Sequence, residues 1–255
     1  MNTLKTIALA LTLFCFATSC KKDTVTPAPA PVSKKLQKIT WSQDLADVQN
    51  FTYDAQGRLI KSEDDYTTNT YSYNANTVAM KEFRKSENRF VSDITGTTDN
   101  AGRMITNTGN FSYNINTPYT EKTDFVYDAN GYLTQITRTS GVNVQTYDFT
   151  ISNGDYIKLI YQKTSGGGYT RVTDFYTDKK DMSGLGSAPL SYANDHTGLF
   201  GKMNTHLVKF EQSTSSGSPT PSWTRNLTYT FDSNGYVLTS GSTGTWTGTG
   251  VYTYQ

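Results

Sequence analysis

Hydrophobic and polar residues alternate along most of the chain from residue 36 onward. Tyr147, Phe149 and Ile151 are separated by single polar residues, and the segment 49–54 repeats this pattern with two aromatic side chains. A period of two places alternate side chains on the same face of a β-strand. No segment after residue 36 combines a 3.6-residue period with helix caps, so the pattern predicts an all-β fold.

A short turn motif, Asp-x-x-Gly followed by Arg or Tyr and then an apolar residue, separates several predicted strands. Its four copies are 54–59, 99–104, 128–133 and 232–237. The aspartate can hydrogen-bond the downstream backbone, and the glycine supplies a positive φ that returns the chain with a bulge. Four copies therefore predict hairpins of an antiparallel meander, with Gly57, Gly131 and Gly235 at positive φ.

The length of the alternating region predicts a large sheet. At usual strand and turn lengths, residues 36–255 hold roughly 14–17 strands, which must curl, close or split. Lys158 and Asp148 interrupt the apolar band that a membrane-spanning barrel would need. We predict a soluble barrel or strongly curved sheet, with 36–255 as a single β-meander domain.

Residues 1–19 have the features of a lipoprotein signal peptide. Lys5 precedes the apolar run 6–18, which at about 1.5 Å per residue is too short to span a bilayer of roughly 30 Å. The small residues 17–19 then lead into Cys20 and resemble the lipobox of bacterial lipoproteins. The resemblance implies lipidation of Cys20 and anchoring in the cell envelope, with the outer membrane as the expected site. An ordinary signal peptide with an incidental cysteine is the alternative.

Residues 20–35 contain the lipidated cysteine and a Pro/Ala-rich tether. Alternating Pro and Ala favour extended polyproline II, a semi-rigid spacer. Within it, Asp23-Thr24-Val25 resembles the Asp-Thr-aliphatic acceptor for O-glycosylation in Bacteroidota-type exported proteins, which makes Thr24 a candidate glycosylation site. A solvated linker threonine is the alternative.

Charge and composition narrow the function classes. The 23 Lys and Arg residues balance the 22 Asp and Glu residues, which argues against nucleic acid as a partner. Two Cys and two His residues leave little material for metal sites or thiol catalysis. We expect no catalytic residue, no metal ligand and no cofactor.

Two regions provide candidate ligand-facing residues. Trp246 lies in a Thr/Gly-rich stretch with almost no apolar neighbours, and an exposed aromatic ring can stack on a sugar. The segment 179–206 is the only long stretch without alternation, and it contains Tyr192, Lys202 and Asn204. We expect this segment to pack back on the sheet, either as a core-filling crossover or with a binding role.

The turn motifs resemble the YD repeats of RHS-type shell proteins, although few, irregularly spaced copies argue against a large toxin shell. The chain is more similar to a family of Bacteroidota-type exported lipoproteins of unknown function with a porin-like fold. Besides the hairpins, the features that carry this similarity are Lys38–Trp41, Gly201–Leu207 and Tyr252–Tyr254. Thr205-His206 departs from the Lys-Asn expected in this family. The resemblance implies a porin-like barrel and no known activity.

These observations favour a non-enzymatic, lipid-anchored envelope protein that acts as a binding or assembly module. The expected partners are the membrane, through Cys20, and a glycan or an envelope protein. A structural surface scaffold is one alternative. An enzyme with a carboxylate pair brought together from distant strands is another.

Overall fold

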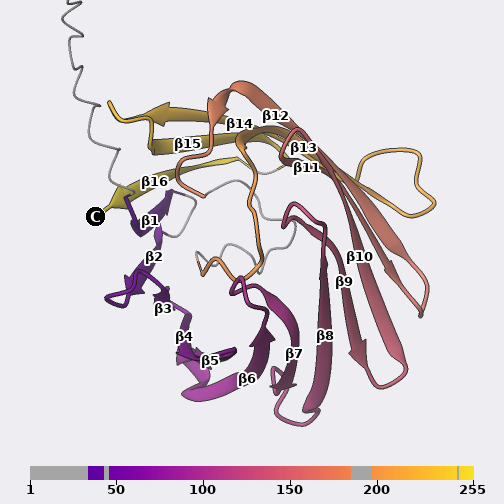
Figure 1. Cartoon of the computed structure of the whole chain (residues 1–255). Helices are drawn as coiled ribbons and strands as arrows, with labels where there is room; N and C mark the ends of the chain where they lie inside the picture. Colours follow the sequence, from indigo (N-terminus) through magenta and orange to yellow (C-terminus); the bar gives the residue numbers. More distant parts are fainter. Residues whose placement is uncertain (1–33, 43–45, 185–196, 246) are drawn as a thin grey trace, which may run out of the picture. The chain divides into compact units, whose positions relative to one another are not determined.

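In the described part of the chain, the alternating segments form sixteen antiparallel strands that close into a barrel (Figure 1). The computed structural model describes residues 34–42, 46–184, 197–245 and 247–255. The strands are β1 (Leu36–Ser42), β2 (Ala46–Tyr53), β3 (Leu59–Glu63), β4 (Thr67–Asn74), β5 (Thr77–Arg84), β6 (Arg89–Thr98), β7 (Met104–Phe111), β8 (Tyr119–Tyr127), β9 (Leu133–Ser140), β10 (Asn143–Ser152), β11 (Asp155–Lys163), β12 (Gly168–Lys180), β13 (His206–Ser215), β14 (Trp223–Phe231), β15 (Val237–Gly244) and β16 (Gly248–Tyr254). A 3-10 turn, η1 (Lys85–Glu87), joins β5 to β6. The predicted all-β meander is confirmed, and its strand number falls within the predicted range.

The barrel closes where the first strand meets the last. Strand β1 pairs with β16, with Ile39 opposite Tyr252, and every other pairing joins strands that are neighbours in sequence. Two backbone hydrogen bonds between Lys35 and Gln255, of 3.1 and 2.9 Å, extend the closing pair beyond the strands. Closure leaves none of the described strands with an unpaired edge.

In this meander, successive connections lie alternately at the two ends of the barrel. All four Asp-x-x-Gly turns follow even-numbered strands, as do residues 181–184 after β12 and residues 197–205 before β13. They therefore lie at one end, which we call the turn end. Connections after odd-numbered strands lie at the other, which we call the loop end, and they include η1 and residues 112–118.

The turns have the geometry that their sequence predicts. In the first copy, Asp54 Oδ1 accepts hydrogen bonds from the backbone N–H groups of Gln56 and Arg58, at 3.0 and 2.9 Å. Gly57, Gly131 and Gly235 have φ values of 75°, 89° and 86°, which confirms the predicted left-handed positions. The strand register shifts beside each of the four turns, as expected for a bulge.

Inward-facing residues form two apolar clusters. Met104, Leu133 and Ile136 are fully buried in one, and Leu59 and Leu207 in the other. Outward-facing positions in mid-strand carry polar pairs instead, such as the ion pairs Lys122–Asp124 and Lys81–Asp93. Among the described residues, no helix is long and apolar enough to cross a bilayer.

Candidate ligand-binding cavity

The segment 197–205 lies across the turn end of the barrel. Its backbone pairs with three successive hairpins: Leu199 O accepts from Met104 N at 2.7 Å, and Lys202 N donates to Gly131 O at 2.9 Å. Thr205 N donates to Gly154 O at 3.0 Å. Leu199 is 3% exposed and belongs to the first apolar cluster. The expectation that the non-alternating stretch packs back on the sheet is confirmed for these residues, drawn in orange in Figure 1.

A glycine permits the close approach of this segment to the barrel. Gly201 has a φ of 77°, and a Cβ placed on it would lie 2.5 Å from the carbonyl oxygen of Gly131. Any larger residue would meet both backbone strain and a direct clash with main chain. Gly201, the first residue of the Gly201–Leu207 feature noted in the sequence, therefore determines how closely the segment packs on the hairpin.

Asn204 and Lys202 have different surroundings within this segment. Asn204 is 6% exposed, and its Oδ1 accepts from Tyr156 N at 2.8 Å. The Tyr156 hydroxyl accepts from Leu133 N at 2.9 Å and donates to Lys202 O at 3.0 Å, and burial raises its pKa. The Lys202 side chain is exposed, with its ammonium 5.3 Å from the centroid of the Tyr132 ring. Asn204 thus holds the segment to β11. The other predicted site residues, Cys20, Thr24, Tyr192 and Trp246, lie outside the described residues.

A cavity of about 170 Å³ lies on the inner side of β4–β9. Paired inward positions of adjacent strands line it: Met80 lies opposite Ile94, and Thr123 opposite Arg138. Phe200, from the segment that crosses the turn end, also lines the cavity and packs on Phe125 with ring centroids 5.3 Å apart. The segment therefore contributes both core and cavity wall.

An aromatic ledge borders the cavity toward the loop end. The Phe111 ring stacks with Tyr119 at 5.2 Å and an interplanar angle of 19°, and with Tyr113 at 5.9 Å and 25°. Tyr119 is 43% exposed, which places this ledge at the rim. A Cβ on Gly109 would lie 2.7 Å from the Phe111 ring, so the glycine leaves room for the ring to lie over the strand.

Two carboxylates and one guanidinium line the same cavity. Glu82 Oε2 accepts from the Tyr113 hydroxyl at 2.9 Å. Glu121 Oε1 lies 3.7 Å from Arg138 Nε, which is an ion pair but longer than a hydrogen bond. The Arg138 guanidinium also lies over the Tyr147 ring, 5.5 Å from its centroid. The carboxylates retain capacity to accept hydrogen bonds.

Buried neutral polar groups complete the lining. Ser92, Asn107 and Thr123 are each less than one-tenth exposed. Within the described part of the chain, the hydroxyl groups of Ser92 and Thr123 make no hydrogen bond to another residue. Buried polar groups are normally satisfied by protein, water or ligand, so these groups are available to a molecule in the cavity.

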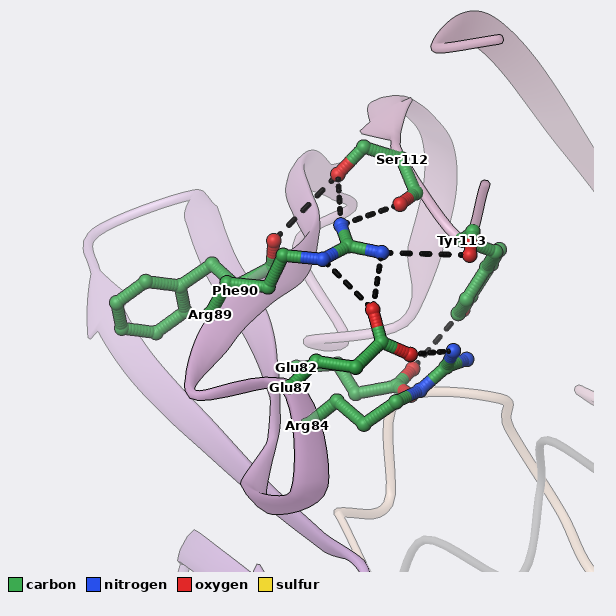
Figure 2. A network of polar contacts seen from close by, with 7 residues as sticks. All are labelled: Glu82, Arg84, Glu87, Arg89, Phe90, Ser112 and Tyr113. Atoms are coloured by element: carbon green, nitrogen blue, oxygen red, sulfur yellow. Dashed lines mark hydrogen bonds and ion pairs between the residues drawn. The ribbon is translucent and has the colours of Figure 1, made fainter. Parts of the chain in front are cut away.

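Figure 2 shows a polar network that fixes the loop-end rim. Glu87 of η1 is paired with both Arg84 and Arg89. Arg89 donates to the carbonyl oxygens of Ser112 and Tyr113, and the Arg84 guanidinium lies 5.5 Å from the centroid of the Tyr113 ring. The network ties η1 to the connection after β7, and it holds the tyrosine that hydrogen-bonds Glu82.

The cavity residues were not identified from the sequence. A usable signal was present, because Glu121 has the same two-residue phase as Thr123 and Phe125, and Glu82 the same phase as Val78 and Met80. A charged residue in phase with core residues points into the barrel. Among the described residues, no group of three His, Cys, Asp or Glu side chains is arranged to hold a metal ion.

The closed sixteen-stranded meander defines the class of protein, an all-β barrel with an internal cavity. A family model described as "Domain of unknown function (DUF4595) with porin-like fold" matches residues 51–240, and the chain belongs to this family. No curated protein matches the chain.

Solved structures that share the fold include two crystal structures from Bacteroides. A porin-like protein from Bacteroides uniformis ATCC 8492 is 16% identical with a TM-score of 0.65, over 89% of this chain and 98% of the other. A porin-like protein from Bacteroides vulgatus ATCC 8482 is 11% identical with a TM-score of 0.67, over 87% and 99%.

Proposed function

We propose that this protein is a lipid-anchored, non-enzymatic binding module of the cell envelope, and that it holds a small ligand inside the barrel. The observation that carries the proposal is the cavity on the inner side of β4–β9, where aromatic rings, carboxylates and buried hydroxyl groups converge. Convergent polar groups in an otherwise apolar pocket are typical of ligand sites. The outer membrane is the compartment that we propose.

The sequence before the barrel supports the anchor. Residues 1–19 have the features of a lipoprotein signal peptide and are followed directly by Cys20. Several acyl chains on one terminus anchor a protein far more firmly than a single chain. The outward ion pair Lys122–Asp124, in mid-strand and about half exposed, favours a barrel that sits in water on such an anchor.

The anchor is tested with the full-length chain expressed in a bacterium that processes lipoproteins. Cys20→Ala is expected to remain unprocessed or to leave the detergent phase on partitioning, whereas Cys15→Ala is expected to behave as the wild type. A Cys20→Ala chain of mature length in the detergent phase would contradict the proposal.

The cavity is tested by filling it. Gly109→Val is expected to displace the Phe111 ring and to abolish binding of any ligand that the wild-type barrel retains. Thr108→Val, on the exposed side of the same strand, is the matched control. A ligand that binds both variants equally well lies elsewhere on the protein.

A second candidate function rests on the carboxylates. Glu82 and Glu121 reach one cavity from distant strands, and glycoside hydrolysis uses such a pair. We assign both to binding because Glu82 is already an acceptor for Tyr113. Nitrophenyl glycosides are expected to show no turnover, and turnover lost in both Glu→Gln variants would establish the enzyme instead.

A further inference from the structure

We infer that the ligand of the cavity is a single neutral sugar ring, such as the terminal pyranose of a glycan. This inference rests on the proposed function, because it specifies the chemistry of a ligand in that same site. Three properties of the lining carry it: volume, aromatic surface and the balance of charges.

The volume fits one six-membered ring. An apolar cavity of about 150 Å³ holds a benzene molecule, and the cavity here measures about 170 Å³. The segment that crosses the turn end limits its depth with Phe200, which packs on Phe125. A long acyl chain or a folded peptide segment would exceed this space, so one ring is the unit that we expect inside. The remainder of a glycan would extend past the rim.

The aromatic ledge matches the faces of a sugar ring. A pyranose presents C–H groups on its faces and hydroxyl groups around its edge, so it needs both an apolar platform and polar partners. Phe111 and Tyr119 form a stacked pair at the rim and line the cavity together. Aromatic rings with a polar tip suit a ligand of this mixed character.

The polar lining favours hydroxyl donors over an anion or an alkyl chain. Glu82 and Glu121 are acceptors. Two cationic residues border the cavity, Arg138 beside Glu121 and Lys81, but the Lys81 ammonium is paired with Asp93 on the outer face at 3.1 Å. Hydroxyl groups of a sugar can donate to both carboxylates, and such charge-assisted bonds are stronger than neutral ones. A uronic acid would bring a third carboxylate into the cavity and be repelled. An alkyl chain would offer no donor to these carboxylates, and it would leave the buried hydroxyl groups of Ser92 and Thr123 without partners.

The test compares four kinds of probe on the folded barrel by calorimetry. The probes are a panel of methyl hexosides, methyl glucuronide, butylamine and hexanoate. We expect at least one neutral hexoside to bind, and the glucuronide to bind about tenfold more weakly or not at all. Equal or tighter binding of the glucuronide, the amine or hexanoate would overturn the inference.

Variants locate the contacts. Glu121→Gln is expected to weaken hexoside binding by about tenfold, because one charge-assisted hydrogen bond is lost. Tyr119→Ala is expected to weaken it by a similar factor. Glu63→Gln, a carboxylate outside the cavity paired with Lys61 and Lys85, is the matched control and is expected to leave affinity unchanged. Unchanged affinity in both cavity variants would also overturn the inference.

The outcome separates this inference from the proposed function. If hexanoate or butylamine binds and Gly109→Val abolishes that binding while no hexoside binds, the cavity is a binding site and the sugar assignment is wrong. If no probe binds, or if all binding survives in Gly109→Val, the proposed function fails as well.

Discussion

The aspartate of the Asp-x-x-Gly turn combines a backbone role with a charge. Asp232 Oδ1 accepts from the backbone N–H groups of Asn234 and Tyr236, while Oδ2 accepts from the Lys34 ammonium at 2.6 Å. The hydrogen bond from Lys34 is the largest influence that lowers the pKa of Asp232, and the two backbone bonds lower it further. The last turn thus fastens Lys34, two residues before β1, to the hairpin that precedes β15.

This pKa predicts acid sensitivity. A carboxyl group whose pKa is lower in the folded state contributes stability above its unfolded value of about 3.8, and the contribution disappears as the pH falls through the folded pKa. The free energy of unfolding of Asp232→Asn is therefore expected to depend less on pH below about 4 than that of the wild type. Urea titrations at a series of pH values measure this. Asp178→Asn, at a highly exposed carboxylate, is the control. An equal change in the pH dependence of both variants would show that Asp232 is not the source of the acid sensitivity.

Substitution of two glycines with the same backbone conformation distinguishes the cost of backbone strain from the cost of a steric clash. Gly102 and Gly201 have φ values of 78° and 77°, but only a Cβ on Gly201 would meet neighbouring atoms. Gly102→Ala is expected to destabilise by about 1 kcal/mol, from left-handed strain alone. Gly201→Ala is expected to cost about 2 kcal/mol more, because its Cβ clashes with Gly131 O. Equal losses in denaturant unfolding would mean that the segment can move away from the hairpin.

At the scale of elements, the two-residue period and the turn motif were sufficient to predict the strands and hairpins. Each Asp-x-x-Gly copy is local, so its bulge and its glycine conformation follow from a few residues, as at Gly57. The docking of 197–205 is different, because its partners Met104, Gly131 and Gly154 lie 50 or more residues away in sequence. The apolar residues of this segment predicted that it packs against the sheet, but they did not predict which hairpins it contacts.

The segment 197–205, which crosses the turn end, is expected to stabilise the whole barrel. Leu199 is buried against the first apolar cluster, and removal of a buried leucine side chain usually costs about 2–5 kcal/mol. Leu199→Ala is expected to fall in that range in chemical unfolding. Lys202→Ala, at an exposed side chain of the same segment, is expected to change stability by less than about 0.5 kcal/mol. A Leu199 effect as small as the Lys202 effect would show that the segment is not part of the core.

At the scale of the whole molecule, closure of the barrel brings together residues that no local sequence pattern relates to one another. The pairing of β1 with β16 joins the first and last described strands and completes the sheet. The cavity collects residues from six strands, from the connection after β7 and from the segment 197–205, so its members are spread over more than 130 positions, from Asn69 to Phe200. The sequence could mark Glu82 and Glu121 as inward-facing, but only the closed barrel places both in one cavity.

Both the proposed function and the sugar assignment require that the ligand binds inside the barrel. Amide chemical shifts of the isotopically labelled barrel, recorded while a methyl hexoside is added, report which residues the ligand contacts. We expect the shifted residues to cluster on the inward positions of β5–β8, with Ser92, Glu121 and Thr123 among them. Shifts confined to outward positions such as Thr108 and Lys122, or no shifts with any probe that binds, would contradict it.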